Sequence, residues 1–201
     1  MFFTNVAAVT AVVLGLAHAD IEVDARFYRT QPGHVACGGG DVGESCTNLD
    51  ENTCCQASGG GTVGWDTADF YLNAHGMGPR IAGTFYSRQN TDDCGVSLCT
   101  KLDEAECCQP ELLNALQGGK YIDRNDVVTH GTQINLGDGT HKGCVETDSY
   151  VHKAFSGHVY YVKKSNASTS TPIESLWSLG EYDLLKEFII RHANLVREEQ
   201  T

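Results

Sequence analysis

Residues 46–56 of the chain read CTNLDENTCCQ, and residues 99–109 read CTKLDEAECCQ. The two stretches differ at only three of their eleven positions, and in each of them seven residues separate a single cysteine from a CC pair. We call each stretch a cassette. Two copies are too few for a solenoid. The repeat therefore predicts a duplicated structural unit, and by itself it names no chemistry.

The chain contains nine cysteines, and all of them follow residue 19. Aligning the cassettes also places Cys37 opposite Cys94 if a gap of four residues is allowed. Two sets of four cysteines then correspond. We predict that they form disulfides: Cys37, Cys46, Cys54, Cys55, Cys94, Cys99, Cys107 and Cys108. Cys144 has no counterpart, which predicts a free thiol or an intermolecular bridge in a disulfide-linked dimer.

The adjacent cysteines restrict how bridges form. A disulfide needs Cα atoms about 4.4–6.8 Å apart with converging Cβ vectors, so sequence neighbours do not easily bridge each other. Cys54 and Cys55 are therefore expected to have different partners. The Leu-Asp-Glu of each cassette suits a short helical turn, so we expect one stapled turn per cassette. Because no CxxC pair and no zinc-type Cys/His spacing is present, we predict no metal.

Residues 1–19 have the pattern of a secretory signal. They contain no charged side chain, hold an apolar run over residues 6–16 and end in Ala-His-Ala. We expect cleavage before Asp20. A membrane anchor or a buried helix is the alternative, but the run is shorter than the roughly 20 apolar residues of a bilayer span. The pattern predicts a secreted, extracellular protein in which cysteines oxidise.

The net charge of −12 is a second constraint on partners. Nucleic acid and anionic membrane surfaces repel a negative protein at long range. We therefore predict neither as a partner, and no membrane span.

The remaining sequence predicts mainly strands. Residues 84–86 and 158–162 have strand composition, as do 127–129 and 132–135, which run into a hairpin signal at 137–139. Residues 110–116 predict a short helix that begins at a proline. Residues 163–172 are polar and predict a linker or exposed loop, and the apolar spacing over 181–199 predicts an amphipathic helix.

Together these patterns predict an α+β, disulfide-rich fold that is mainly β, with two related cysteine units and a C-terminal amphipathic helix. The expected segments are a signal peptide (1–19), a disulfide-rich domain (20–165) and a linker with a helix packed on the same domain (166–201). The two related units are expected at about residues 37–93 and 94–162.

Motifs with chemical meaning are few. Residues 38–43 and 59–64 satisfy G-x-G-x-x-G, but neither lies between a predicted strand and a helix, so we predict no cofactor. His75, His130 and His141 lie beside glycines or in predicted turns and are candidate bases, although no hydrolase signature accompanies them and no catalytic residue is assigned. Asn166 begins a glycosylation sequon, which predicts a glycoprotein.

The signal pattern, the acidic composition and the duplicated C-x7-CC block resemble small secreted cysteine-rich proteins of fungi. The resemblance implies an effector- or toxin-like virulence protein that binds an extracellular or host protein, or a cell-wall glycan. One alternative is a secreted enzyme, a hydrolase or toxin-type transferase, with a His/carboxylate cleft. Another is a structural protein of the cell wall or surface. Binding predicts an exposed aromatic patch, for which Trp65, Phe70 and Tyr71 are candidates.

Overall fold

The structure is a computed structural model that describes residues 22–30, 36–57, 64–73, 81–90, 92–101, 107–111, 115–123 and 141–199. Its elements are β1 (Glu22–Arg29), β2 (Val42–Cys46), β3 (Thr53–Gln56), β4 (Thr67–Asn73), β5 (Ile81–Gln89), β6 (Asp92–Lys101), β7 (Gly118–Asp123), β8 (Gly143–Glu146), β9 (Ser149–Lys153), β10 (His158–Lys163), α2 (Ala167–Leu179), α3 (Tyr182–His192) and β11 (Leu195–Glu198). Strands predominate and four disulfides are present, which confirms the α+β, disulfide-rich class. The predicted signal peptide and the predicted strands and hairpin over 127–139 lie outside the described residues.

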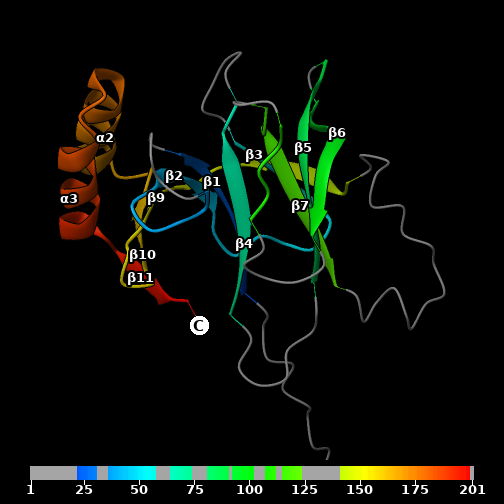
Figure 1. The fold of residues 1–201 in the computed structure, drawn as a ribbon, viewed down its shortest axis with the longest axis horizontal. Helices are drawn as coiled ribbons and strands as arrows, with labels where there is room; N and C mark the ends of the chain where they lie inside the picture. The colour runs from blue at the N-terminus through cyan, green and yellow to red at the C-terminus, as the bar shows by residue number, and fades with distance from the viewer. Residues whose placement is uncertain are drawn as a thin grey trace, which may run out of the picture.

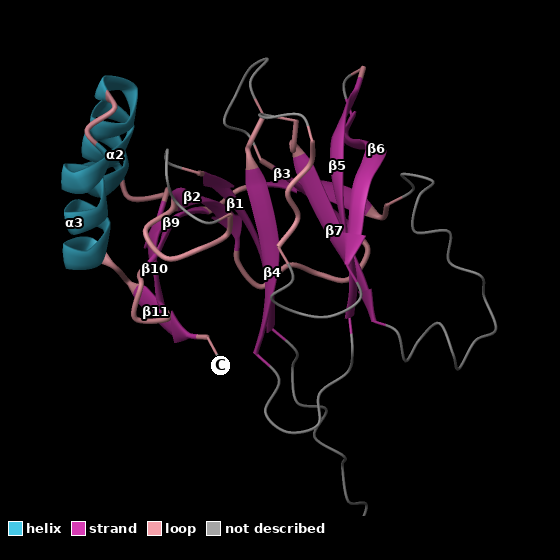
Figure 2. Ribbon diagram, viewed as in Figure 1, coloured by secondary structure: helices cyan, strands magenta, loops and turns pink. Residues whose placement is uncertain are grey.

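The strands form two sheets. Sheet 1 has the order β11-β10-β9-β2-β1-β4, and sheet 2 has the order β6-β5-β7-β3-β8. The two helices lie beside sheet 1, and sheet 2 lies on the opposite side of the molecule, so the fold has three layers (Figure 1). The helices are confined to one outer layer, and β11 follows them in the chain and returns to sheet 1 (Figure 2).

Strand pairing gives two matching units that begin at β1 and β5, earlier than the predicted starts at about residues 37 and 94. In the first unit β1 lies between β2 and β4, and in the second β5 lies between β6 and β7, all antiparallel. Phe27 of β1 pairs with Ala68, which bridges to Cys108. Phe85 of β5 pairs with Gly119, which pairs with Cys55. The last strand of each unit thus pairs with the cassette of the other unit. The first strands of the two units, β1 and β5, begin at residues 22 and 81.

The main core fills the space between the sheets. The rings of Phe70 and Phe85 stack with centroids 4.4 Å apart, and Phe27 meets Phe85 edge to face at 5.6 Å. Two glycines make this approach possible. A Cβ on Gly83 would lie 2.3 Å from the Phe70 ring, and one on Gly119 would lie 2.8 Å from the Phe85 ring. Larger residues at these positions would force the sheets apart.

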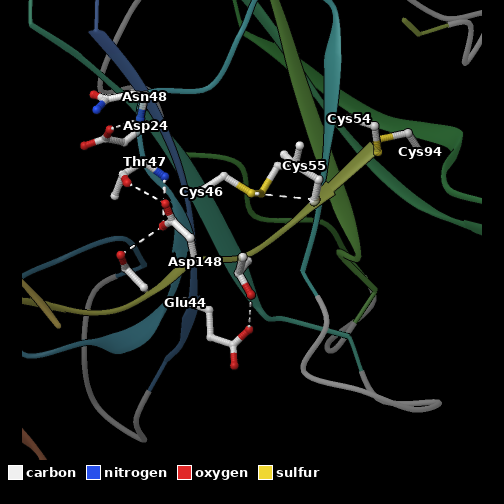
Figure 3. Close-up of a disulfide and its surroundings, with 12 residues drawn as sticks. Asp24, Glu44, Cys46, Thr47, Asn48, Cys54, Cys55, Cys94 and Asp148 are labelled. Carbon is white, nitrogen blue, oxygen red and sulfur yellow. Dashed lines mark hydrogen bonds between the residues drawn. A yellow bond between two sulfur atoms is a disulfide. The ribbon is translucent and has the colours of Figure 1, made fainter. Parts of the chain in front are cut away.

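The disulfides follow the repeat. Within each cassette the first cysteine joins the last, in Cys46–Cys55 and Cys99–Cys108. Between the units the pairing is reciprocal, because Cys54 of the first cassette joins Cys94 and Cys107 of the second joins Cys37. Figure 3 shows Cys54 and Cys55 directed to opposite sides of their strand. A β-strand turns successive side chains to opposite faces, which is why the neighbours have different partners.

The first cassette forms a stapled turn without a helix. The Thr53 amide donates to the Asp50 carbonyl at 3.1 Å, and β3 begins there. Asn48 and Asn52 have positive φ angles of 52° and 56°. Asparagine tolerates this left-handed conformation better than most residues. The corresponding residues 102–106 of the second cassette lie outside the described part of the chain.

Sheet 1 is rolled so that its two edge strands meet. The Tyr71 hydroxyl of β4 donates to the Glu198 carbonyl of β11 at 3.4 Å, although four strands lie between them in the sheet order. In a flat sheet with strands about 4.8 Å apart, the two edges would be about 24 Å apart. Alternate residues of β1 therefore face the inside of the roll, and Val23, Ala25 and Phe27 face sheet 2.

Sheet 2 is rolled in the same way. The Cα atoms of Cys54 in β3 and Cys94 in β6 are 6.1 Å apart across their disulfide. Two strands, β7 and β5, separate β3 from β6 in the sheet order, and in a flat sheet this gap would be about 14 Å. His141, just before edge strand β8, also lies 3.5 Å from Asp92 of the other edge strand.

The C-terminal segment differs from the prediction. The predicted helix over 181–199 ends at His192, and residues 195–198 form β11, which pairs with β10. The Asn194 amide donates to the Tyr161 carbonyl at 3.0 Å, which turns the chain back onto sheet 1. Pairing with an open strand edge therefore overrides the helical spacing of Leu195 and Val196.

Two further local predictions were wrong. Residues 163–172 are not a linker, because α2 begins at Ala167 with Asn166 as its N-cap and contains Pro172. Ile173 of α2 is buried against sheet 1 together with Leu185 and Ile189 of α3. Residues 110–116 form no helix where they are described, and Leu116 instead makes a bridge to Trp65.

Candidate functional site

A cavity of about 390 Å³ lies where α2 meets the outer face of sheet 1. Its side chains come from the end of β1, from β2 and β9, from the segment just before β4, from the residue after β10 and from the second half of α2. Its lining consists of three aromatic residues, two cations, two carboxylates and a hydroxyl: Trp65, Tyr150, Trp177, Arg29, Lys164, Glu44, Glu174 and Ser178. The volume falls in the range of roughly 300–1,000 Å³ typical of small-molecule sites.

The aromatic side of the cavity is built around Trp65. Its ring meets Trp177 of α2 edge to face at 5.4 Å, and the Arg29 guanidinium lies 5.1 Å above it. Trp65 is only 2 % exposed, and its indole N–H has no acceptor among the described residues. Buried indole N–H groups usually find a hydrogen-bond partner. The lining of the cavity therefore includes a tryptophan whose donor has no acceptor among the described residues.

The charged side of the cavity is held by internal pairs. The Lys164 ammonium lies 2.8 Å from a Glu44 carboxylate oxygen and 5.0 Å from the centre of the Tyr150 ring. Thr147 donates to the same Glu44 oxygen at 2.7 Å. The Tyr150 hydroxyl donates to Glu174 at 2.8 Å. These contacts fix the side chains before any ligand arrives.

Tyr150 is a donor at physiological pH. Burial, followed by its hydrogen bond to Glu174, raises the pKa of the Tyr150 hydroxyl well above the ordinary value. The hydroxyl therefore keeps its proton, which it shares with the Glu174 carboxylate.

A second polar cluster lies inside the roll of sheet 1. Arg26 of β1 contacts Asp69 at 2.5 Å and Glu199 at 2.8 Å, and Lys153 lies 2.9 Å from Glu199. The side chains of Arg26 and Asp69 are fully buried. Arg197 of β11 lies 2.7 Å from Asp24. We call these six residues the ionic seam, because they join β1 and β4 to β9, β11 and the residue after it.

The pKa values of two carboxyl groups of the ionic seam, Asp24 and Glu199, are shifted in opposite directions. Burial raises the pKa of Asp24 above its ordinary value, although the Asn48 amide and Arg197 lower it in part. Burial would also raise the pKa of Glu199, but Arg26 and Lys153 outweigh it and hold that pKa below the ordinary value. Every charge in the seam has an opposite partner, which is the arrangement of a structural closure.

A third cluster surrounds the free thiol. The Cys144 sulfur lies 3.7 Å from both ring nitrogens of His141, and His141 Nε2 lies 3.5 Å from Asp92. Cysteines that are thiolates at neutral pH have a lowered pKa. Here burial, then Asp92 and Asp93, raise the pKa of the Cys144 thiol. The cluster therefore lacks the activated thiolate of a cysteine hydrolase.

The same cluster does not make a metal site. Cys54, His141 and Cys144 offer ligand atoms within 4.8 Å of one another. Cys54 is bonded to Cys94, so its sulfur is not a thiolate. The two remaining ligands are fewer than the three or four protein ligands of zinc sites.

The predicted site residues have different fates. Trp65 and Phe70 are 2 % and 3 % exposed, so the predicted exposed aromatic patch was wrong for both. His75 and His130 lie outside the described residues. Asn166 is exposed and caps α2, where its side-chain oxygen accepts from the Ser168 amide and hydroxyl at 3.1 Å and 2.7 Å.

Most of the residues that line the cavity could not be identified from the sequence. Its cations, carboxylates and Tyr150 come from separate elements and carry no local motif. One signal was present: the chain contains two tryptophans, and both line this cavity.

No protein-family model, curated protein or solved structure matches this chain. Among the described residues, neither helix combines the length and the apolar character that crossing a bilayer would require.

Proposed function

We propose that this protein is secreted and acts by binding a saccharide, of the kind found in cell-wall glycans, in the cavity beside α2. The disulfide-rich fold is compatible with secretion, since structural disulfides persist in oxidising compartments. The observation that carries the proposal is a cavity in which aromatic rings lie beside paired, hydrogen-bonding charges.

The balance of charge in the lining favours a neutral polar ligand. Two cations, Arg29 and Lys164, face two carboxylates, Glu44 and Glu174. A ligand of large net charge would be repelled by the lining groups that carry the same sign of charge. A sugar ring is neutral, stacks its C–H face on an aromatic ring and presents hydroxyls that both donate and accept. The partly exposed ring of Trp177 and the indole N–H of Trp65, which has no acceptor among the described residues, match these properties.

The cavity is also rigid before binding. Lys164, Glu44 and Thr147 hold one another, and Tyr150 holds Glu174. Side chains that are already ordered lose little entropy when a ligand binds, so more of the contact energy becomes affinity. An effector- or toxin-like role toward a host remains the biological hypothesis, and it rests on the resemblance to small secreted cysteine-rich proteins.

Tryptophan fluorescence tests this proposal directly, because both tryptophans of the chain line the cavity. The purified oxidised protein is titrated with soluble oligosaccharides of chitin, β-1,3-glucan and cellulose. We expect at least one of them to change the emission in a saturable way. Glu174→Ala removes an exposed carboxylate, and we expect it to weaken binding roughly tenfold, as for loss of a hydrogen bond to a charged group.

The matched control is Leu184→Ala, which shortens an exposed side chain on α3 and is expected to leave affinity unchanged. Absence of any saturable change with all three oligosaccharides would contradict the proposal. Shortening of a bound oligosaccharide during incubation would instead favour the alternative of a secreted hydrolase, with Glu44 and Glu174 as the first carboxylates to replace.

A further inference from the structure

Strand pairing in sheet 2 places the free thiol beside a disulfide. Strands β3 and β8 are parallel, and Cys54 is the register partner of Cys144. The two sulfur atoms and a ring nitrogen of His141 lie within 4.8 Å of one another. Cys54 is at the same time bonded to Cys94. A nucleophile, a candidate base and an electrophilic sulfur are therefore gathered at one place.

We propose that Cys144 is an internal nucleophile toward the Cys54–Cys94 disulfide, so that the protein interconverts between two disulfide isomers. Cys144 gives its proton to His141, and its thiolate attacks the sulfur of Cys54. The Cys54–Cys144 bond forms, the Cys54–Cys94 bond breaks, and Cys94 leaves as a thiolate that takes up the proton. One thiol and one disulfide are present before and after, so no oxidant or reductant is needed.

The groups around Cys144 set the pH range of the exchange. His141, which lies two residues before β8, faces the thiol, and Asp92 and Asp93 face it from β6. Arg88 of β5 lies 3.2 Å from Asp93 and offsets part of that charge. Because burial and the two aspartates raise the thiol pKa, exchange is slow in acid and accelerates in alkali.

The exchange changes which strands are tied together. Cys54–Cys94 joins β3 to β6, an edge strand that reaches β3 only because sheet 2 is rolled. Cys54–Cys144 would join β3 to β8, its hydrogen-bonded neighbour. The second isomer therefore releases β6 from β3 and leaves sheet 2 without that covalent closure.

Thiol trapping distinguishes the isomers. The oxidised protein is held without added thiol at about pH 5 or about pH 9, quenched in acid, then unfolded and alkylated. Tryptic cleavage gives peptide 143–153, whose single cysteine is Cys144, and peptide 89–101, which contains Cys94 and Cys99 and in which fragmentation assigns the alkylated residue. We expect only Cys144 to be alkylated after the acidic incubation, and both Cys144 and Cys94, in complementary fractions, after the alkaline one.

Two controls test the role of Cys144. Alkylating it in the folded protein, or replacing it in Cys144→Ser, should abolish the appearance of the Cys94 thiol. His141→Gln should slow that appearance without changing its final extent. A Cys94 thiol that appears equally without Cys144, or never appears in wild type, would overturn the proposal. Recovery of Cys144 only in disulfide-linked dimers with Cys54–Cys94 intact would also overturn it.

Discussion

The two sheets solve the same problem with different chemistry. Each is rolled until its edges meet, and each therefore needs contacts that hold strands distant in the sheet order together. Sheet 1 is closed by the ionic seam, in which paired residues lie up to 173 positions apart in the chain. Sheet 2 is closed by Cys54–Cys94, with a sequence separation of 40.

The difference determines what each closure responds to. A buried ion pair depends on protonation and on the presence of both partners, because one charge left alone in the interior is costly. A disulfide carries no titrating charge of its own and depends on redox conditions and on nearby thiols that can exchange with it. The protein therefore has one half that is sensitive to charge and one that is sensitive to thiols, and single substitutions can separate the two.

The largest expected effect comes from breaking the ionic seam. Arg26→Met leaves the buried Asp69 carboxylate with Lys153, 3.5 Å away, as its remaining cation, and we expect this to lower the free energy of unfolding by about 3–5 kcal/mol. Urea unfolding of the oxidised protein, followed by tryptophan fluorescence, measures it. Asp183→Asn is the control, since that side chain is 97 % exposed, and it should cost less than about 1 kcal/mol.

A double variant sharpens this test. Arg26→Met combined with Asp69→Leu removes both charges and leaves the Lys153–Glu199 pair in place. We expect the double variant to be more stable than Arg26→Met alone, because no unpaired charge remains. A double variant less stable than the single one would show that the seam does not act as charge pairs.

The disulfide closure ranks next. Removing Cys54–Cys94 as a pair of alanines should cost about 4 kcal/mol and removing Cys46–Cys55 about 2.5 kcal/mol in the chain-entropy description. The reason is the sequence separation, 40 residues against 9. The same urea titration measures both, with Cys144→Ser as a control expected to be neutral. A larger loss for the shorter loop would contradict the closure role.

A smaller effect is expected outside both closures. Asn166→Ala removes the N-cap of α2 and should cost about 1 kcal/mol, whereas Asn166→Asp retains a capping oxygen and should cost less. Both substitutions abolish the sequon, so any attached glycan disappears equally from their mass spectra. If the two variants lost the same stability, the loss would come from the glycan and not from the cap.

The smallest effect is a change in pH dependence. The pKa of Glu199 lies below its ordinary 4.5 in the folded protein. Its contribution to stability is therefore complete above that value and is lost as the pH falls through the folded pKa. Between about pH 6 and about pH 3, wild type should lose more stability than Glu199→Gln. Equal losses in parallel urea titrations would exclude Glu199 as the acid-sensitive member.

The cassettes carried most of what the sequence could reveal about the fold. Peptide geometry separates the partners of Cys54 and Cys55 without any structure, and the duplicated spacing indicates two related units. The reciprocal connectivity was not predictable, because bringing Cys54 to Cys94 requires the roll of sheet 2, which depends on packing over the whole chain.

The ionic seam was hidden for a related reason. Strand β1 alternates polar Asp24 and Arg26 with apolar Ala25 and Phe27, the pattern of a strand with one solvated face. The roll covers that polar face with β10 and β11. Sequence alternation identifies two different faces but does not say that the polar one is buried.

The predicted bounds of the helices were wrong because other local structures competed with the helical pattern. The Ser/Thr-rich start of α2 favours loops on propensity alone, and the Asn166 cap together with the buried Thr169 and Ile173 stabilises the helix there. At the other end the apolar spacing continued past His192, but β10 offered an open edge. The cavity could not be predicted for the same reason, because two of its lining residues, Glu174 and Trp177, belong to α2.

The crossed bridges also bear on how such a chain could have arisen. A polypeptide with a single cassette and its leading cysteine could form the disulfide within the cassette by itself. Its leading cysteine and the first cysteine of its CC pair could form the disulfides seen between the units only with a second copy of the polypeptide, related to the first by a two-fold axis. The present molecule has the covalent connectivity of such a homodimer after gene fusion. Cutting the chain between residues 73 and 81 would therefore leave two halves held as one covalent particle.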